Sequence, residues 1–321
     1  METKDFFGYS SGMKYTKLIL SGTFRDTGDQ TKSVSAAATA KDFRFDEFLV
    51  RTEKIIRSRR IGFVLVEVRS DFQPFLFSGA EEVRKRLEKV RESGKEIIFF
   101  AKTYTSLILY LASCADRRYI HPLGSLSFLG FSRSFLFFKK LMDSQGIEAE
   151  IVRRGRYKSA GDRFRTDRLD AANEEQYSAY YRTMMRHARE KTAAGFRKEE
   201  EELERLEDGR LLDARSAVEE GWMDEVSTLE SLEEQWKKEE KHKELKIKGR
   251  GRTFSKGRKK IAVLVFEGAV VDGKTGHLPL IGQAVGSDTF NGYIEKLEKK
   301  RSVKGVVLRI NSGGGSATAS E

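Results

Sequence analysis

The stretch Arg309-Ile-Asn-Ser-Gly-Gly-Gly-Ser-Ala-Thr-Ala-Ser-Glu321 marks the point at which a predicted strand turns into a helix. It follows the apolar run Val303-Lys-Gly-Val-Val-Leu308, whose composition is typical of a buried strand. Three consecutive glycines then end the strand, because glycine tolerates positive φ and lets one backbone approach another closely. The small residues that follow suit the opening of a helix.

The hydroxyl of Ser316 comes directly after these glycines. We therefore expect it on an exposed turn, beside the unpaired N–H groups of a helix start. An acyl-transfer nucleophile needs that setting, with an exposed oxygen and donors that face the developing oxyanion. A flexible Gly/Ser loop or a phosphate-binding turn has the same local sequence, so the motif needs support from the rest of the chain.

Length and charge limit the class of protein. A chain of 321 residues with 39% hydrophobic content can form one large or two medium domains. Much of the net charge of +11 lies between Lys237 and Lys260, where twelve Lys or Arg accompany three Glu. This segment indicates a solvated linker, with weak attraction to anionic lipid as the alternative. Nucleic-acid binding is not expected, because aromatic residues are not interleaved with the basic ones.

Other residue types exclude several kinds of site. Cys114 is the only cysteine and lies in an apolar run, so we expect a buried, unpaired thiol. The four histidines lack the spacing of metal ligands, and we expect neither a metal nor a cofactor. No run approaches the length of a transmembrane helix, and the first residues lack a secretory signal pattern.

Strand and helix patterns alternate along the chain, which predicts an α/β fold with helices around a largely parallel sheet. The predicted strands cover residues 15–20, 61–68, 96–101, 119–122, 148–152, 260–267 and 303–308. The predicted helices cover residues 45–56, 81–93, 105–115, 133–145, 171–207 and 288–300. The large apolar residues of 133–145 indicate a core face, or alternatively an interface with a partner or peptide.

The pattern of the first residues restarts after the basic segment. Lys260-Ile-Ala-Val-Leu-Val-Phe-Glu-Gly268 resembles Thr16-Lys-Leu-Ile-Leu-Ser-Gly22, and the helix and strand that follow also recur. We interpret this as two tandem copies of one domain. The predicted organisation is a first repeat over 1–236, a basic linker over 237–260, and an incomplete second repeat over 261–321. Where the second repeat has its glycine-serine turn, the first has Ser70-Asp-Phe-Gln-Pro74, without those glycines and without a serine placed like Ser316.

A serine nucleophile needs a base, and no histidine lies near a recognisable partner motif. A Ser–Lys pair is the other solution. The lysine must then be desolvated, because an ordinary lysine is protonated at neutral pH. Lys158, in Tyr157-Lys-Ser-Ala160, is flanked by a ring and two small residues and is our candidate. A lysine that only forms a salt bridge is the plainer interpretation of this residue by itself.

Gly155-Arg-Tyr-Lys-Ser-Ala160 and Asn311-Ser-Gly-Gly-Gly-Ser-Ala-Thr-Ala-Ser-Glu321, in this order across a duplicated domain, resemble the motifs of bacterial signal peptide peptidases of the long, two-domain type, also called protease IV. The resemblance implies a Clp protease/crotonase-like fold of repeated ββα units. It implies a serine endopeptidase that degrades cleaved signal peptides, with Ser316 as nucleophile and Lys158 as general base. The implied oxyanion donors are the N–H groups of Ala317 and of either Gly282 or Gly286.

The same resemblance implies a homo-oligomer with inward-facing active sites and association with the membrane of a bacterial cell. Three departures stand out: the family's membrane anchor is absent, the second repeat stops just after Ser316, and Gly313 stands where proline is frequent. We therefore expect residues 1–321 by themselves to be inactive. Two alternatives remain, namely a non-catalytic assembly or peptide-binding module, and the acyl-CoA chemistry found on related folds.

Overall fold

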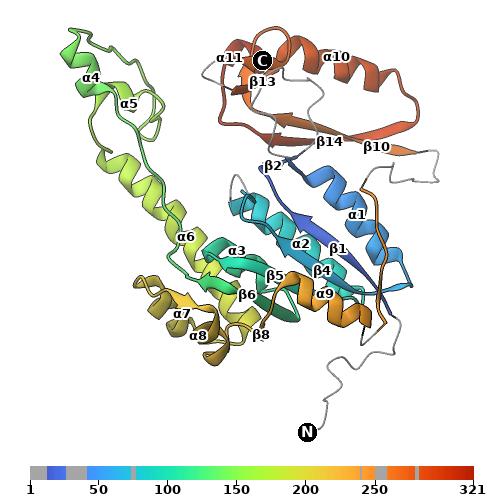
Figure 1. Cartoon of the computed structure of the whole chain (residues 1–321). Coiled ribbons are helices and arrows are strands. Elements are labelled where there is room, and N and C mark those ends of the chain that lie inside the picture. The colour runs from blue at the N-terminus through green and yellow to red at the C-terminus, as the bar shows by residue number, and fades with distance from the viewer. Residues whose placement is uncertain (1–12, 27–41, 74–76, 239–240, 250–258, 279–281) are drawn as a thin grey trace. The chain divides into compact units, whose positions relative to one another are not determined.

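The computed structural model describes residues 13–26, 42–73, 77–238, 241–249, 259–278 and 282–321 (Figure 1). The chain divides into two compact units, each built from segments that are far apart in sequence. Unit 1 contains residues 1–19, 62–70 and 76–243, and unit 2 contains residues 20–61, 71–75 and 244–321. The α/β class is confirmed. The predicted domain boundaries stay predictions.

Unit 1 is organised by a sheet of seven strands among the described residues, in the order β7-β6-β5-β4-β1-β9, with β8 paired to β6. The central pairs β4–β5 and β5–β6 are parallel, and only the short β7 is antiparallel to β6. Strands β4 and β5 are apolar at consecutive positions, as expected for central parallel strands that are covered on both faces. The strands are β1 (Lys14–Leu20), β4 (Ile61–Val68), β5 (Glu96–Tyr104), β6 (Arg117–Leu126), β7 (Leu212–Asp213), β8 (Glu225–Val226) and β9 (Lys243–Glu244).

Helices bury apolar side chains against this sheet. In α2 (Phe77–Glu92), Val83, Leu87 and Val90 are fully buried, as the spacing predicts, and Gly94 follows with φ of 81°. The indole of Trp236, in α9 (Leu229–Lys238), packs edge-on against two rings of the sheet, those of Tyr15 and Phe63. The remaining helices of unit 1 are α3 (Ser106–Ala112), α4 (Lys139–Ser144), α5 (Asp162–Arg165), α6 (Ala171–Phe196), α7 (Glu200–Glu207) and α8 (Ala214–Glu219).

Two predictions for the middle of the chain are wrong. The helix expected over 133–145 is reduced to α4, because the rings before it are held singly by other segments rather than along one helical face. Phe135 packs against Tyr177, and Phe138 stacks on Phe164. The strand expected over 148–152 does not form, because no strand among the described residues pairs with this segment, and Val152 is 93% exposed.

Unit 2 contains short strand pairs that precede two helices. β2 (Phe24–Arg25) pairs in parallel with β3 (Phe43–Arg44), which leads into α1 (Phe45–Arg57). β11 (Ala269–Val271) pairs in parallel with β13 (Gly282–Gly286), which leads into α10 (Ser287–Glu298). β12 (Gly276–Leu278) is antiparallel to β13, and β10 (Lys260–Glu267) is parallel to β14 (Val303–Asn311).

The apolar residues Phe45, Phe48, Leu49, Ile55 and Ile56 were expected on one buried face of α1, but neither Leu49 nor Ile56 is fully buried. Leu49 is 37% exposed, because the buried positions are Phe45, Phe48, Thr52 and Ile55, and Thr52 donates its hydroxyl to the carbonyl of Phe48. The predicted linker over 237–260 contains the end of α9 and strand β9, while residues 239–240 and 250–258 lie outside the described residues.

Candidate active site

The serine turn of unit 2 is held by backbone contacts with β11. The N–H of Val270 donates to the carbonyl of Gly314 at 3.1 Å, and the N–H of Ser316 donates to the carbonyl of Val270 at 2.9 Å. Gly314 has φ of 102°, and a Cβ on Gly315 would lie 2.0 Å from the carbonyl oxygen of Val270. Both positions therefore require glycine, one for its backbone conformation and one for its close approach.

The turn ends where α11 (Ala317–Ser320) begins, with Ser316 as its N-cap, as predicted. The Oγ of Ser316 accepts a hydrogen bond from the N–H of Ala319 at 3.2 Å, which is the usual task of an N-cap serine. The same hydroxyl donates to Oδ2 of Asp272 at 2.8 Å. Its oxygen is also 2.7 Å from Oγ1 of Thr318, whose hydroxyl reaches the same carboxylate.

Asp272 is the site residue that the sequence analysis missed. It lies directly after β11, and its carboxylate joins the hydroxyls of Ser316 and Thr318. A signal for it was present, since Gly22-Thr-Phe-Arg-Asp26 and Gly268-Ala-Val-Val-Asp272 share the spacing from glycine to aspartate. Both glycines have positive φ, 79° and 108°. The recurrence of this aspartate in both predicted copies indicates a common local chain path.

The three oxyanion candidates lie in unit 2, but their roles stay predictions. Ala317 is the first residue of α11. Gly286 caps α10, and its N–H donates to Oγ1 of Thr275 at 3.0 Å, so this donor is already engaged. Gly282 opens β13 opposite Leu278. A Cβ on Gly286 would lie 2.2 Å from the carbonyl oxygen of Gly273, the residue after Asp272, so this glycine lies close to the site.

Lys158 belongs to unit 1 and is exposed. It follows a turn at Gly155, whose φ is 99° and whose carbonyl accepts from the N–H of Lys158 at 3.4 Å. None of the described residues forms an ion pair with its Nζ. The desolvation that a lysine base requires is therefore not supplied by the neighbours of Lys158 within this unit.

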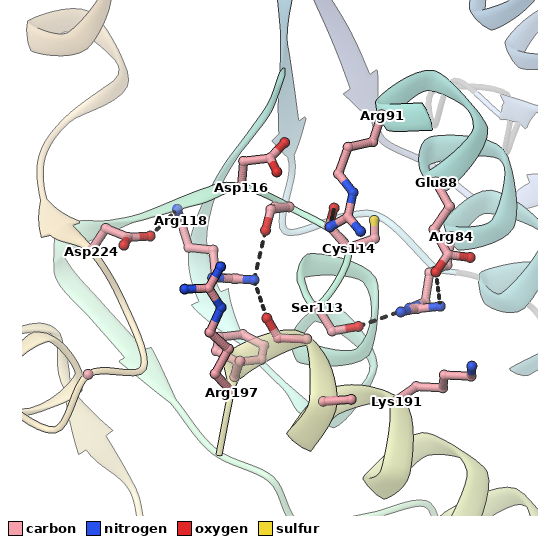
Figure 2. Close-up of a pocket in the computed structure, with 15 residues that line it drawn as sticks. Arg84, Glu88, Arg91, Ser113, Cys114, Asp116, Arg118, Lys191, Arg197 and Asp224 are labelled. Carbon is pink, nitrogen blue, oxygen red and sulfur yellow. Dashed lines mark hydrogen bonds and ion pairs between the residues drawn. The ribbon is translucent and has the colours of Figure 1, made fainter. Parts of the chain in front are cut away.

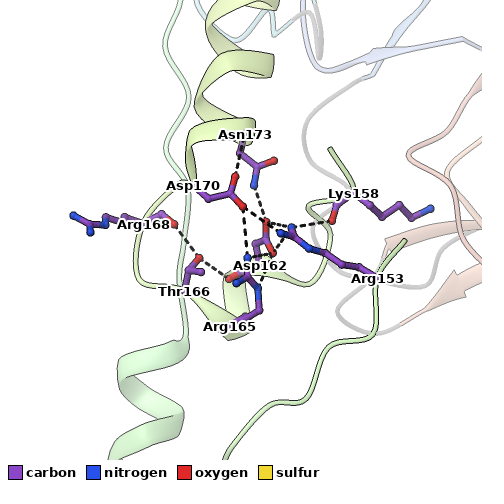
Figure 3. A network of polar contacts seen from close by, with 8 residues as sticks. All are labelled: Arg153, Lys158, Asp162, Arg165, Thr166, Arg168, Asp170 and Asn173. Atoms are coloured by element: carbon purple, nitrogen blue, oxygen red, sulfur yellow. Dashed lines mark hydrogen bonds and ion pairs between the residues drawn. The ribbon is translucent and has the colours of Figure 1, made fainter. Parts of the chain in front are cut away.

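A buried carboxylate anchors the segment that carries Lys158 (Figure 3). Asp162 is 4% exposed and accepts hydrogen bonds from Arg153, Arg165 and the side-chain amide of Asn173. Arg153 also reaches Asp170 and, at 3.5 Å, the carbonyl of Lys158. Because Asp170 is the N-cap of α6, the network ties the lysine turn to the start of the longest helix. The pairing of Lys158 with Ser316 stays a prediction.

The remaining sequence predictions concern the thiol of Cys114, metal ligands and membrane-spanning helices. Cys114 is buried, as predicted, and burial raises the pKa of its thiol to about 12, so it is protonated at neutral pH. Among the described residues, no group of three or more His, Cys, Asp or Glu side chains is arranged to hold a metal ion. In the same part of the chain, no helix has the length and apolar character that crossing a bilayer requires.

Comparisons with known proteins show that the segment around Lys158 is similar to a protease family. Residues 89–243 match the sequence profile of peptidase family S49. "Protease 4" of Haemophilus influenzae is 27% identical over 262 residues, and "Protease 4" of Salmonella typhi is 27% identical over 270 residues. These matches cover 72% and 76% of this chain but only 40% and 42% of the relatives, so the chain spans less than half of their length.

A shorter relative and a solved structure complete the comparison. The "Putative signal peptide peptidase SppA" of Enterococcus faecium is 25% identical over 236 residues, which cover 72% of this chain and 65% of that protein. A solved enoyl-CoA hydratase/isomerase family protein from Silicibacter pomeroyi has a TM-score of 0.37 and 9% identity, covering 61% of this chain and 69% of its own. That likeness is too small to define the fold by itself.

Proposed function

We propose that this protein belongs to peptidase family S49 and is a serine endopeptidase with Ser316 as its nucleophile. The observation that carries this proposal is the turn itself. Two required glycines present the hydroxyl at the start of α11, and the hydroxyl donates a 2.8 Å hydrogen bond to Asp272. An oriented hydroxyl next to helix N–H groups is suited to attack a peptide carbonyl.

Lys158 is the proposed general base. Its neutral amine takes the proton of Ser316 as Oγ attacks the carbonyl carbon, and then gives that proton to the leaving amine of the peptide. Water hydrolyses the resulting ester with the same amine acting as base. The N–H of Ala317, together with that of Gly282 or Gly286, is proposed to bind the oxyanion; if Gly286 serves, its N–H must exchange Thr275 for the substrate.

The experiment uses protein translated from the complete reading frame and apolar peptides that resemble released signal peptides. We expect Ser316→Ala and Lys158→Ala each to abolish hydrolysis, a loss of roughly a thousandfold or more. Lys140→Ala is a suitable control, because this exposed lysine makes one long ion pair in the same unit. Unchanged turnover in the Ser316 or Lys158 variant contradicts the assignment of that residue.

A non-catalytic, peptide-binding module is the second candidate, and the exposure of Lys158 favours it. A fluorophosphonate probe, which reacts with activated serines, separates the two functions. Labelling of Ser316 that is lost in Lys158→Ala supports the peptidase. Peptide binding without labelling supports the module.

Assembly and membrane contact complete the proposal. The exposed side chains of Leu136 and Leu141 are available to line an interface between subunits or a peptide groove. The basic residues between 237 and 260 are suited to anionic headgroups. Analytical ultracentrifugation that finds only monomers argues against the proposed assembly. Equal co-sedimentation of the protein with neutral and anionic vesicles argues against the proposed membrane contact.

A further inference from the structure

Unit 1 contains a polar pocket of about 550 Å³ that the proposed peptidase chemistry does not use (Figure 2). It lies where the ends of α3 and α6 meet residues of α2 and the start of β6. Its volume is within the range of small-molecule sites and far exceeds that of a single ion. Its lining residues that matter here are cations, carboxylates and the carbonyl groups at the two helix ends.

Positive charge exceeds negative charge in this pocket by two. Arg84, Arg91, Arg118, Lys191 and Arg197 line it together with three carboxylates. Each carboxylate already has a partner within the fold. Glu88 accepts from Arg84 at 2.9 Å, Asp116 from the N–H of Ile97 at 2.8 Å, and Asp224 from the N–H of Arg118 at 2.7 Å.

The negative ends of the two helices are neutralised as well. The guanidinium of Arg118 donates to the carbonyls of Ala115 and Gly195 (Figure 2) and to that of Ala112. Arg91 donates to the carbonyl of Cys114. Burial lowers the pKa of Arg118, which means that its charge is poorly solvated. An anion in the pocket would stabilise that charge.

Two of these five cations, Lys191 and Arg197, pair with no carboxylate among the described residues. Arg197 ends α6 with φ of 55°, the left-handed conformation in which glycine is usual at a helix C-terminus. An arginine at this position bears a conformational cost that glycine avoids. The arginine places a guanidinium at the rim of the pocket, which glycine could not do.

We propose that this pocket binds the phosphate group of a small phosphorylated ligand. The excess of two positive charges matches a phosphate monoester, which carries close to two negative charges at pH 7. Guanidinium groups recognise phosphate oxygens through paired N–H donors, and Arg91, Arg197 and Lys191 are the proposed contacts. The space beyond the phosphate accommodates the organic part of the ligand.

Calorimetric titration with phenyl phosphate at constant ionic strength tests this proposal, with benzoate as the carboxylate of similar shape. We expect saturable binding of phenyl phosphate at one site and at least tenfold weaker binding of benzoate. Lys191→Gln and Arg197→Gln should each weaken phosphate binding about tenfold. Arg215→Gln, which removes an exposed charge outside the pocket, should leave binding unchanged.

Arg197→Gly separates binding from folding. Glycine relieves the left-handed backbone, so we expect the midpoint of thermal unfolding to stay the same or rise while phosphate binding weakens about tenfold. Absence of saturable binding overturns the proposal. So does equal weakening by the Arg215 control, which would indicate general surface charge, or benzoate binding as tight as that of phenyl phosphate.

Discussion

Two regions of unit 2 follow the same chain path and use an aspartate for different purposes. Asp26 and Asp272 each lie four residues after a glycine with positive φ. The carboxylate of Asp26 is buried and pairs with the guanidinium of Arg309 at 2.6 Å. That of Asp272 is exposed and holds the hydroxyl of Ser316. A buried carboxylate fixes packing, whereas an exposed one next to a hydroxyl is available for chemistry.

The residues around Asp26 are also more deeply buried than those around Asp272. Five buried phenylalanines pack together around the first region, namely Phe24, Phe43, Phe45, Phe48 and Phe72. The second region has the glycines of the serine turn, which lie against the backbone of Val270. The comparison teaches that the first region buries aromatic rings, whereas the second presents a hydroxyl.

Removal of one aromatic ring should cause the largest difference in stability between the two regions. Phe48 and Phe290 are each the fourth residue of their helix, but Phe48 is 4% exposed and Phe290 is only half-buried. We expect Phe48→Ala to lower the free energy of unfolding by about 3–5 kcal/mol and Phe290→Ala by roughly half of that. Urea titration measures both, and equal losses would remove the proposed contrast in packing.

Loss of the ion partner of Asp26 should rank second. Arg309→Ala leaves a buried carboxylate without its guanidinium, and we expect a loss of about 3 kcal/mol in the same assay. Arg215→Ala, which breaks an exposed pair with Glu219, should cost less than about 1 kcal/mol. If the two variants are equally stable, the ion pair has no structural role. Asp26→Asn in the Arg309→Ala background should recover part of the loss.

The glycine turn should show a smaller effect. A Cβ at Gly315 meets the carbonyl of Val270, whereas nothing lies within 4 Å of a Cβ at Gly313. We therefore expect Gly315→Ala to cost about 1–3 kcal/mol and Gly313→Ala to change stability by less than about 0.5 kcal/mol. Thermal unfolding of the two variants in parallel checks this, and a harmless Gly315→Ala would contradict the close approach.

The hydrogen bond of Asp272 should have the smallest effect on stability. Asp272→Ala removes an acceptor from two exposed hydroxyls, and we expect a loss of about 1 kcal/mol or less. Asp272→Asn keeps an acceptor oxygen, so its stability should lie between that of the unchanged protein and that of Asp272→Ala. Faster amide hydrogen exchange of Ala319 in the alanine variant, with little change in the asparagine variant, would show that the carboxylate orders the N-cap.

Local sequence patterns predicted those elements whose partners are adjacent in the fold. The strand over 61–68 has the expected bounds, and the helix spacing placed Val83, Leu87 and Val90 in the core, because each apolar position repeats with the period of its element. The prediction of a helix over 133–145 was wrong because the rings of this segment pack against Tyr177 and Phe164, which are distant in sequence.

The candidate site shows the same division. The serine turn was predictable, because glycine, serine and a small-residue helix start are local features. Asp272 was not, since its carboxylate reaches Ser316 from 44 residues away, and an isolated aspartate after a strand has many ordinary roles. The spacing repeated from Gly22 to Asp26 and from Gly268 to Asp272 was the one signal that could have pointed to it.

The ion pair between Asp26 and Arg309 joins residues that are 283 positions apart within one compact unit. The early segment is thereby bound to β14, a strand from a much later part of the sequence. A single protease cut between the two copies, in the basic stretch, should therefore leave two pieces that remain associated and migrate together until a denaturant is added.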